Sequence, residues 1–173
     1  AQSQFARRLA ESGCRVLVPA MIDRRDEFSG NDLVGRFTNQ PHREWIHRQA
    51  YQMGRHVIGY EVQKVLAGVD WFVHDMEDKG ADGTCTIGVA GYGEGGLVAL
   101  YSAAIDPRID AALVSGYFGP REGLWQEPIY RNVWSLLTEF GDAEIAAMVA
   151  PRSLVIEYSR APEIGRASCR ERV

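Results

Sequence analysis

The sequence lacks an apolar run of about 18 residues, the length that a bilayer-spanning helix needs, so we expect no membrane-spanning segment in it. It also lacks a strong excess of one charge. A formal net charge of -4 over 173 residues gives no reason to expect nucleic acid or an anionic membrane surface as a partner. Cysteine is scarce, with three residues, which we interpret as free thiols. The spacings of the four histidines fit no zinc motif, so no metal site is predicted.

The two ends lack the features of natural termini. Residues 1–4 contain neither an initiator methionine nor the basic-then-apolar pattern of a signal peptide. We therefore expect the chain to start within a longer protein, whose localisation the sequence does not indicate. Residues 163–173 have no periodicity and resemble the translation of a widely used short-read sequencing adapter. The expected organisation is one incomplete domain over residues 1–162, truncated at both ends, followed by a non-native tail at 163–173.

The remaining pattern alternates helices with single buried strands. Helical spacing of apolar residues predicts helices over residues 2–12, 41–77, 94–105, 130–139 and 142–148, with Gly54 and Gly59 dividing the second. Short β-branched runs predict strands over residues 15–19, 86–90, 110–115 and 153–158. This alternation predicts an α/β protein with a mostly parallel sheet.

A glycine-rich turn between residues 86 and 100 carries the most chemical information. Gly91 and Gly95 fit G-x-S-x-G, a nucleophile elbow that lifts a reactive side chain above a sheet. The nucleophile position of that pattern holds Gly93, which has no side chain to react. Gly91, Gly93 and Gly96 also fit G-x-G-x-x-G, in which backbone amides face the pyrophosphate of a dinucleotide.

The dinucleotide interpretation would make this chain a segment of a Rossmann-like oxidoreductase. In such a fold the strand after the glycine turn ends in Asp or Glu, which binds the ribose hydroxyls. Here that strand ends at Ser115-Gly116, and the turn follows a third helix instead of opening the domain. The dinucleotide site therefore stays an alternative with weak support.

Three stretches favour the elbow. Residues 87–96 are similar to the pattern I-G-x-x-G-x-S-x-G-G, with Gly93 at the S position. Residues 106–111 match D-P-R-I-x-A, and residues 150–156 resemble A-P-R-P-L-L-I. With these motifs, residues 2–162 resemble the α/β-hydrolase superfamily, specifically its dienelactone-hydrolase-like and acetyl-xylan-esterase-like branch. The resemblance implies a partial α/β-hydrolase fold, with a mostly parallel sheet flanked by helices, and activity of the carboxylic ester hydrolase class.

The superfamily's strand order has consequences for this chain. It places a third strand between the strands that correspond to residues 15–19 and 86–90, and the chain holds no candidate for it. We expect strand 86–90 to pair in parallel with 110–115, which in turn pairs with 153–158. Residues 15–19 should stand apart across a strand-wide gap or collapse against strand 86–90.

The resemblance also assigns site positions, and several lack the required residue. The elbow comprises Gly91, Tyr92, Gly93, Glu94, Gly95 and Gly96. Hydrolysis needs a nucleophile, a late histidine and an orienting acid. Gly93 cannot be the nucleophile, and the histidines (His42, His47, His56 and His74) all precede the elbow, so we interpret them as surface or helix-packing residues. The resemblance makes the Glu94 backbone N–H an oxyanion donor, with its carboxylate solvated or facing the empty nucleophile position, and places Glu157 nearest the acid.

Two polar loops, residues 24–39 and 117–127, follow predicted strands, at the sheet edge where open α/β sheets bind ligands. Their candidate cleft residues are Arg24, Arg25, Tyr117, Arg121 and Trp125. The sequence thus predicts a hydrolase-like domain that is inactive as it stands, or a non-catalytic homologue that binds a small-molecule or carbohydrate ester. No cofactor is predicted, and the oligomeric state is not indicated.

Overall fold

The structure, a computed structural model, describes residues 4–23, 42–78 and 86–159. The elements along the chain are α1 (Phe5–Glu11), α2 (His42–Gln52), α3 (Val57–Asp78), β1 (Gly88–Tyr92), α4 (Glu94–Ile105), β2 (Ala111–Ser115), the short 3-10 turns η2 (Leu124–Gln126) and η3 (Ile129–Arg131), α5 (Leu136–Glu139), α6 (Asp142–Ala147) and β3 (Ser153–Glu157). The α/β class and most predicted elements are confirmed.

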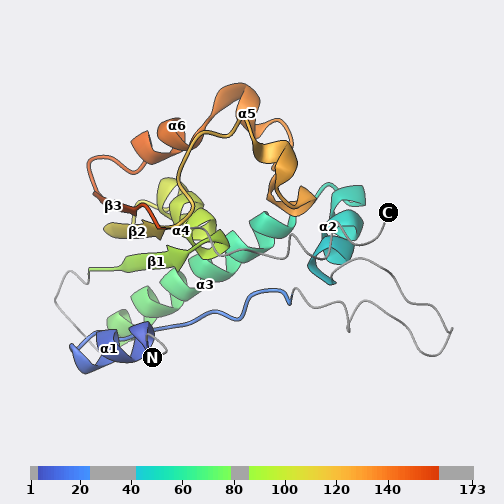
Figure 1. The fold of residues 1–173 in the computed structure, drawn as a ribbon. Helices are drawn as coiled ribbons and strands as arrows, with labels where there is room; N and C mark the ends of the chain where they lie inside the picture. The colour runs from blue at the N-terminus through green and yellow to red at the C-terminus, as the bar shows by residue number, and fades with distance from the viewer. Residues whose placement is uncertain (1–3, 24–41, 79–85, 160–173) are drawn as a thin grey trace, which may run out of the picture.

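The strands form a three-stranded parallel sheet in the order β1-β2-β3 (Figure 1). Gly88 lies opposite Ala111, and Ala111 lies opposite Ser153. This is the predicted pairing. The strand predicted over residues 86–90 lies two residues later, as β1, because its ladder continues through Tyr92, which pairs with Ser115. The ladder therefore runs directly into the glycine-rich turn.

α4 packs against β1 and β2 and fills the centre of the molecule. Its Leu100 and Ala103 are fully buried against Val114 of β2, and α6 adds Ile145 to this cluster. The other side of α4 packs against α3, where Leu97 meets Ile58 in a second apolar cluster. The apolar run of α4 thus contacts the sheet on one side and α3 on the other, which explains why so many of its residues are buried.

Residues 14–23, which we call the leading segment, do not form the predicted buried strand. The segment is extended but pairs with no strand among the described residues, and Leu17 and Val18 are exposed. It runs along α3 in the opposite direction: Arg15 pairs with Asp75, and Lys64 Nζ donates to the Ala20 carbonyl at 3.0 Å. Because α3 side chains bind its polar groups, the segment lies on a helix and not in the sheet.

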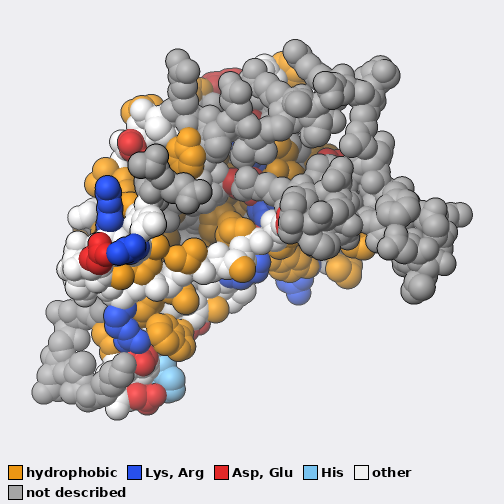
Figure 2. Space-filling view, turned by 60° about the horizontal axis from the view of Figure 1, so that its bottom comes forward, with side chains coloured by type: hydrophobic (Ala, Val, Ile, Leu, Met, Phe, Trp, Pro, Cys, Tyr) orange, Lys and Arg blue, Asp and Glu red, His pale blue; other side chains and the backbone are white. Residues whose placement is uncertain are grey.

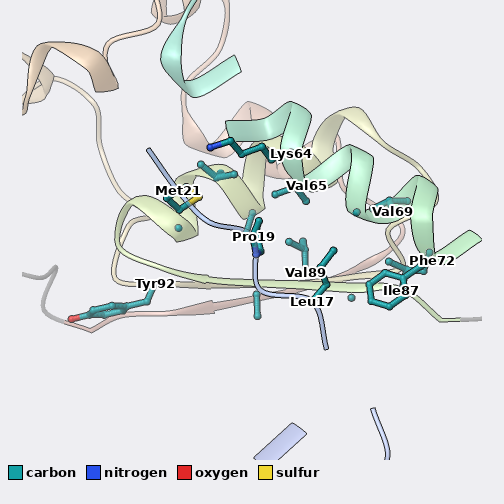
Figure 3. Close-up of a pocket in the computed structure, with 16 residues that line it drawn as sticks. Leu17, Pro19, Met21, Lys64, Val65, Val69, Phe72, Ile87, Val89 and Tyr92 are labelled. Carbon is teal, nitrogen blue, oxygen red and sulfur yellow. The ribbon is translucent and has the colours of Figure 1, made fainter. Parts of the chain in front are cut away.

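A cavity of about 370 Å³ separates the leading segment from β1, so the expectation that residues 15–19 stand apart from β1 is confirmed. Figure 3 shows Leu17 and Pro19 of the segment between Val65 and Val69 of α3 and Val89 of the strand. The wall is mainly apolar. The cavity therefore continues the hydrophobic core up to the free edge of β1.

The helical region before the sheet divides once. Gly54 has φ 67° and lies between α2 and α3, whereas Gly59 lies within α3. Only the first of the two predicted breaks is confirmed, because a positive φ ends a helix and a glycine in helical conformation does not. No helix in residues 4–23, 42–78 or 86–159 has both the length and the apolar character needed to cross a membrane. Exposed hydrophobic side chains nevertheless form a large part of the surface in Figure 2.

Candidate functional site: the glycine elbow and its charge network

The elbow, residues 91–96, is a sharp strand-to-helix turn with Gly93 at its tip. Gly93 has φ 58° and ψ -120° and is the residue immediately before α4. Its N–H donates to the Ser115 carbonyl at 2.8 Å, and its own carbonyl accepts the N–H of Gly96 at 2.9 Å. These bonds fix a backbone conformation that residues with a side chain rarely adopt.

Close backbone contacts explain two of the other glycines. A Cβ atom on Gly91 would lie 1.9 Å from the Gly95 carbonyl oxygen, so no side chain fits there. A Cβ atom on Gly96 would lie 3.0 Å from the Ser115 carbonyl oxygen and 3.1 Å from the Tyr117 Cβ. The glycine pattern thus lets the start of α4 lie directly against the sheet.

Glu94 follows the tip, and its carboxylate is buried. It is 1% exposed and forms an ion pair with Arg43 of α2, while its second oxygen lies 3.2 Å from Arg131 Nε. The expectation of a solvated carboxylate was wrong, because the guanidinium groups of Arg43 and Arg131 hold it inside the protein. The alternative, a carboxylate that faces the empty nucleophile position, stays a prediction. The Glu94 backbone N–H, at the first position of α4, remains a candidate oxyanion donor.

These contacts belong to a chain of alternating charges that extends on both sides of Glu94. On one side Arg43 Nη1 lies 2.6 Å from Glu61 of α3, which also receives Lys64 at 3.0 Å and the Ile22 N–H at 2.7 Å. Burial alone would raise the pKa of Glu61, but its hydrogen bonds with Ile22, Arg43 and Lys64 hold that pKa below the usual value.

On the other side Arg131 Nη1 lies 3.2 Å from Glu127, and Arg121 Nη1 contacts the same carboxylate at 3.0 Å. Arg121 Nε then pairs with the buried Asp142 at 3.1 Å. Burial raises the pKa of Asp142, and the attraction of Arg121 offsets only part of that effect. For Arg131, burial would lower the pKa, but Glu94 and Glu127 raise it above the usual value.

Of the predicted cleft residues, only Tyr117 and Arg121 are in contact in the described part of the chain. Tyr117 and Arg121 lie together: the guanidinium carbon is 4.4 Å from the ring centre, and Arg121 Nη2 donates to the Tyr117 carbonyl at 2.9 Å. Burial raises the pKa of Tyr117. Trp125 is 80% exposed and stands outside this contact. Arg24 and Arg25 lie outside the described residues.

His47 and His56 pack against each other, as the sequence interpretation expected for helix-packing residues. His56 Nδ1 accepts the Ile58 N–H at 3.1 Å, and its Nε2 lies 3.1 Å from the Asn132 carbonyl. The ring of buried His47 packs edge-on against His56, with 4.8 Å between centroids. Burial lowers the pKa of both rings. His74 is exposed on α3.

Glu157 ends β3 opposite Ser115, with an exposed side chain. Near it the hydroxyls of Ser115 and Ser159 lie 3.2 Å apart. Both strands therefore end in polar groups at the same edge of the sheet as the elbow. No group of three or more His, Cys, Asp or Glu side chains within the described part of the chain is arranged to hold a metal ion.

The sequence interpretation missed most of the charge network. Asp142 is the first residue of the predicted helix 142–148, and its carboxylate also accepts the Gly119 N–H at 3.1 Å. One signal was present: Glu61 lies three residues after Ile58 and four before Val65, on the apolar face of α3. A carboxylate on such a face needs a buried cation as a partner. The identity of that partner, Arg43, depends on how α2 packs against α3.

The profile of the dienelactone hydrolase family matches residues 1–134. This range includes α2, α3, the whole elbow, β2 and the loop that carries Arg121 and Arg131. Neither a curated protein nor a solved structure matches the chain. The family match covers more than half of the sequence and agrees with the parallel sheet and the strand-to-helix elbow. The chain belongs to the dienelactone hydrolase family.

Proposed function

We propose that this chain is a dienelactone hydrolase family domain that binds a small-molecule or carbohydrate ester without hydrolysing it. The observation that carries the proposal is the glycine at the tip of a fully formed elbow. Gly93 takes φ 58° and ψ -120°, and its N–H is bonded to the end of β2, yet it has no atom that could attack a carbonyl carbon. Loss of the serine nucleophile of a hydrolase typically removes on the order of 10⁶ of rate.

The contacts of the histidines, the candidate general bases, support the same proposal. A base must lie within hydrogen-bond reach of the nucleophile and have a free ring nitrogen. Both ring nitrogens of His56 are engaged with backbone groups, and the ring of His47 packs against it. No histidine follows residue 74 in the sequence. We therefore expect Gly93→Ser alone to restore no hydrolysis.

The features that remain at this edge suit binding. The positive end of the α4 helix dipole lies at the elbow and attracts a carbonyl oxygen. Trp125, at 80% exposed, offers an aromatic face of the kind that packs against apolar surfaces, including those of sugar rings. A ligand with a carbonyl group and a sugar ring would use both features.

The test combines an activity assay with a binding assay. Wild type and Gly93→Ser should hydrolyse p-nitrophenyl acetate at the background rate, and an acetylated xylo-oligosaccharide should raise the Tm without losing its acetyl groups. The deacetylated oligosaccharide is the matched control and should give a smaller shift. Turnover that disappears on substitution of one residue would contradict the proposal, as would equal Tm shifts with both oligosaccharides.

A further inference from the structure

The segment between β2 and α5 leaves the elbow and returns to it. At its start a Cβ atom on Gly96 would lie 3.1 Å from the Cβ of Tyr117, so this end lies directly against the first turn of α4. At its end Arg131 contacts Glu94, in the same turn of α4, at 3.2 Å. We call residues 117–131 the strap. Figure 1 shows it between the sheet and α2.

Side chains attach the strap to the rest of the protein. Within residues 117–131 the structure has only the two short turns η2 and η3 and no strand. The last part of the strap is fixed by Tyr130, which is buried against Leu97 and Val98 with the guanidinium of Arg43 5.2 Å from its ring. The middle part, around Trp125, is exposed. Its charged contacts to the rest of the protein run through Arg121 and Arg131.

Glu127 joins the two arginines of the strap. Its two carboxylate oxygens lie 3.0 Å from Arg121 and 3.2 Å from Arg131. Each arginine has a further partner outside the strap, Asp142 for Arg121 and Glu94 for Arg131. Removal of the Glu127 charge would therefore free the middle of the strap, while both arginines would keep a carboxylate partner.

Glycines just before the strap and within it allow the backbone to change conformation. Gly116 precedes it with φ 63°, a conformation suited to glycine. Gly119 and Gly123 have open space where a Cβ atom would lie. Glu127 itself is partly exposed, with 28% of its side chain accessible, so water can compete for it. Glycines at the start of a segment and a partly hydrated ionic contact in its middle are typical of a loop that opens locally.

We propose that the strap is a lid on the elbow, held closed by the contacts of Glu127 with Arg121 and Arg131, and that loss of these contacts opens the tip at Gly93 to ligands. The proposal concerns access to the elbow and holds whether or not the elbow hydrolyses an ester. It assigns Glu127 a positioning role, because the carboxylate acts through the two arginines.

The first test is amide hydrogen exchange on the whole chain. Glu127→Gln keeps the shape of the side chain and removes its charge, so amides of residues 121–127 should exchange about tenfold faster than in wild type, equivalent to about 1.4 kcal/mol of closing free energy. Glu44→Gln is the matched control, since Glu44 forms an ion pair with Arg48 within α2 that includes no residue of the strap. It should leave exchange in residues 121–127 unchanged. Equal exchange in wild type and Glu127→Gln would overturn the proposal.

The second test reports on the tip. A Gly93→Cys variant places a thiol there, and its alkylation by iodoacetamide can be followed by peptide mapping, which separates it from the native cysteines. The thiol should react about tenfold faster when Glu127→Gln is added and at an unchanged rate when Glu44→Gln is added. Equal rates in all three proteins would show that the strap does not control access. If Gly93→Cys does not fold, amide exchange at residues 93–96 of the elbow provides the second readout and should be faster in Glu127→Gln than in wild type.

Discussion

At the scale of single residues, the glycines of this chain differ in what a side chain would meet. A Cβ atom on Gly91 would lie 1.9 Å from a backbone oxygen, which cannot move without breaking the first turn of α4. Gly59 lies within α3 with open space around it. We therefore expect Gly91→Ala to lower the free energy of unfolding by about 3 kcal/mol or more, and Gly59→Ala to raise it by about 0.5–1 kcal/mol.

Urea unfolding of both variants measures the two effects against wild type. Their opposite signs separate a specific clash at the elbow from a general response to replacing glycine. Destabilisation of both variants by a similar amount would contradict the close contact at Gly91. An unchanged stability of Gly91→Ala would show that the elbow can relax around a methyl group.

His56 predicts a pH dependence of stability. Burial lowers the pKa of His56 in the folded protein, and the hydrogen bond between its Nε2 and the Asn132 carbonyl offsets only part of that effect. The unfolded chain, with a histidine pKa of about 6.5, binds the proton first as the pH falls. The stabilising contribution is thus complete above about pH 7 and is lost progressively below about pH 6.5.

Asparagine at position 56 keeps an acceptor for the Ile58 N–H but does not titrate. We expect His56→Asn to flatten the decrease in unfolding free energy between about pH 7 and pH 5.5. His74→Asn is the control, because His74 is exposed and should leave the slope unchanged. Parallel pH profiles for wild type and His56→Asn would rule out this contribution.

At the scale of elements, the β1-α4-β2 unit separates the two interpretations of the glycine motif. A dinucleotide site needs a carboxylate where the second strand ends, and β2 ends at Ser115, opposite Tyr92. Glu94, the carboxylate nearest to the turn, is bound by Arg43 and Arg131 inside the protein. We therefore predict that neither NAD nor FAD raises the Tm. A saturable shift that Gly93→Val abolishes would favour an oxidoreductase.

The outcome for each element shows what the sequence could predict. β2, β3 and α4 have apolar interiors and were predicted within one residue at each end. The leading segment has the same local pattern but lies on α3, because Arg15, Ala20 and Ile22 bind side chains of a helix about 40–60 residues later in the chain. Propensity describes neighbours in sequence, so it could not identify these partners.

For the candidate site, the sequence predicted the elbow but most of the charge network was missed. The glycine motif indicated the elbow and the absent nucleophile, because its glycines all lie within residues 91–96. The charge network connects α2, α3, α4, the strap and α6, and its pairs are distant in sequence, such as Arg43 with Glu94. Only the position of Glu61 on an apolar helix face indicated that buried charges exist.

At the scale of the whole molecule, the sheet has two free edges among the described residues. Asp110 donates to the Ile87 carbonyl at 2.8 Å, and Gly93 donates to the Ser115 carbonyl at 2.8 Å, so odd-numbered residues of β1 bond toward β2. The backbone groups of Gly88 and Ala90 therefore point the other way, toward the apolar cavity beside the leading segment. Together the open edge and the cavity favour association with another strand.

We therefore predict that the isolated chain associates in a concentration-dependent way through β1. Ala90→Pro removes an N–H that points away from β2, so it should reduce association at little cost in Tm, as proline is tolerated on edge strands. Val89→Pro is the matched control. It removes a donor on the β2 side of the strand, and we expect it to unfold the sheet. Sedimentation velocity over a series of protein concentrations measures the association. A sedimentation coefficient independent of concentration in wild type, or equal association in Ala90→Pro, would mean that the edge of β1 is not the contact.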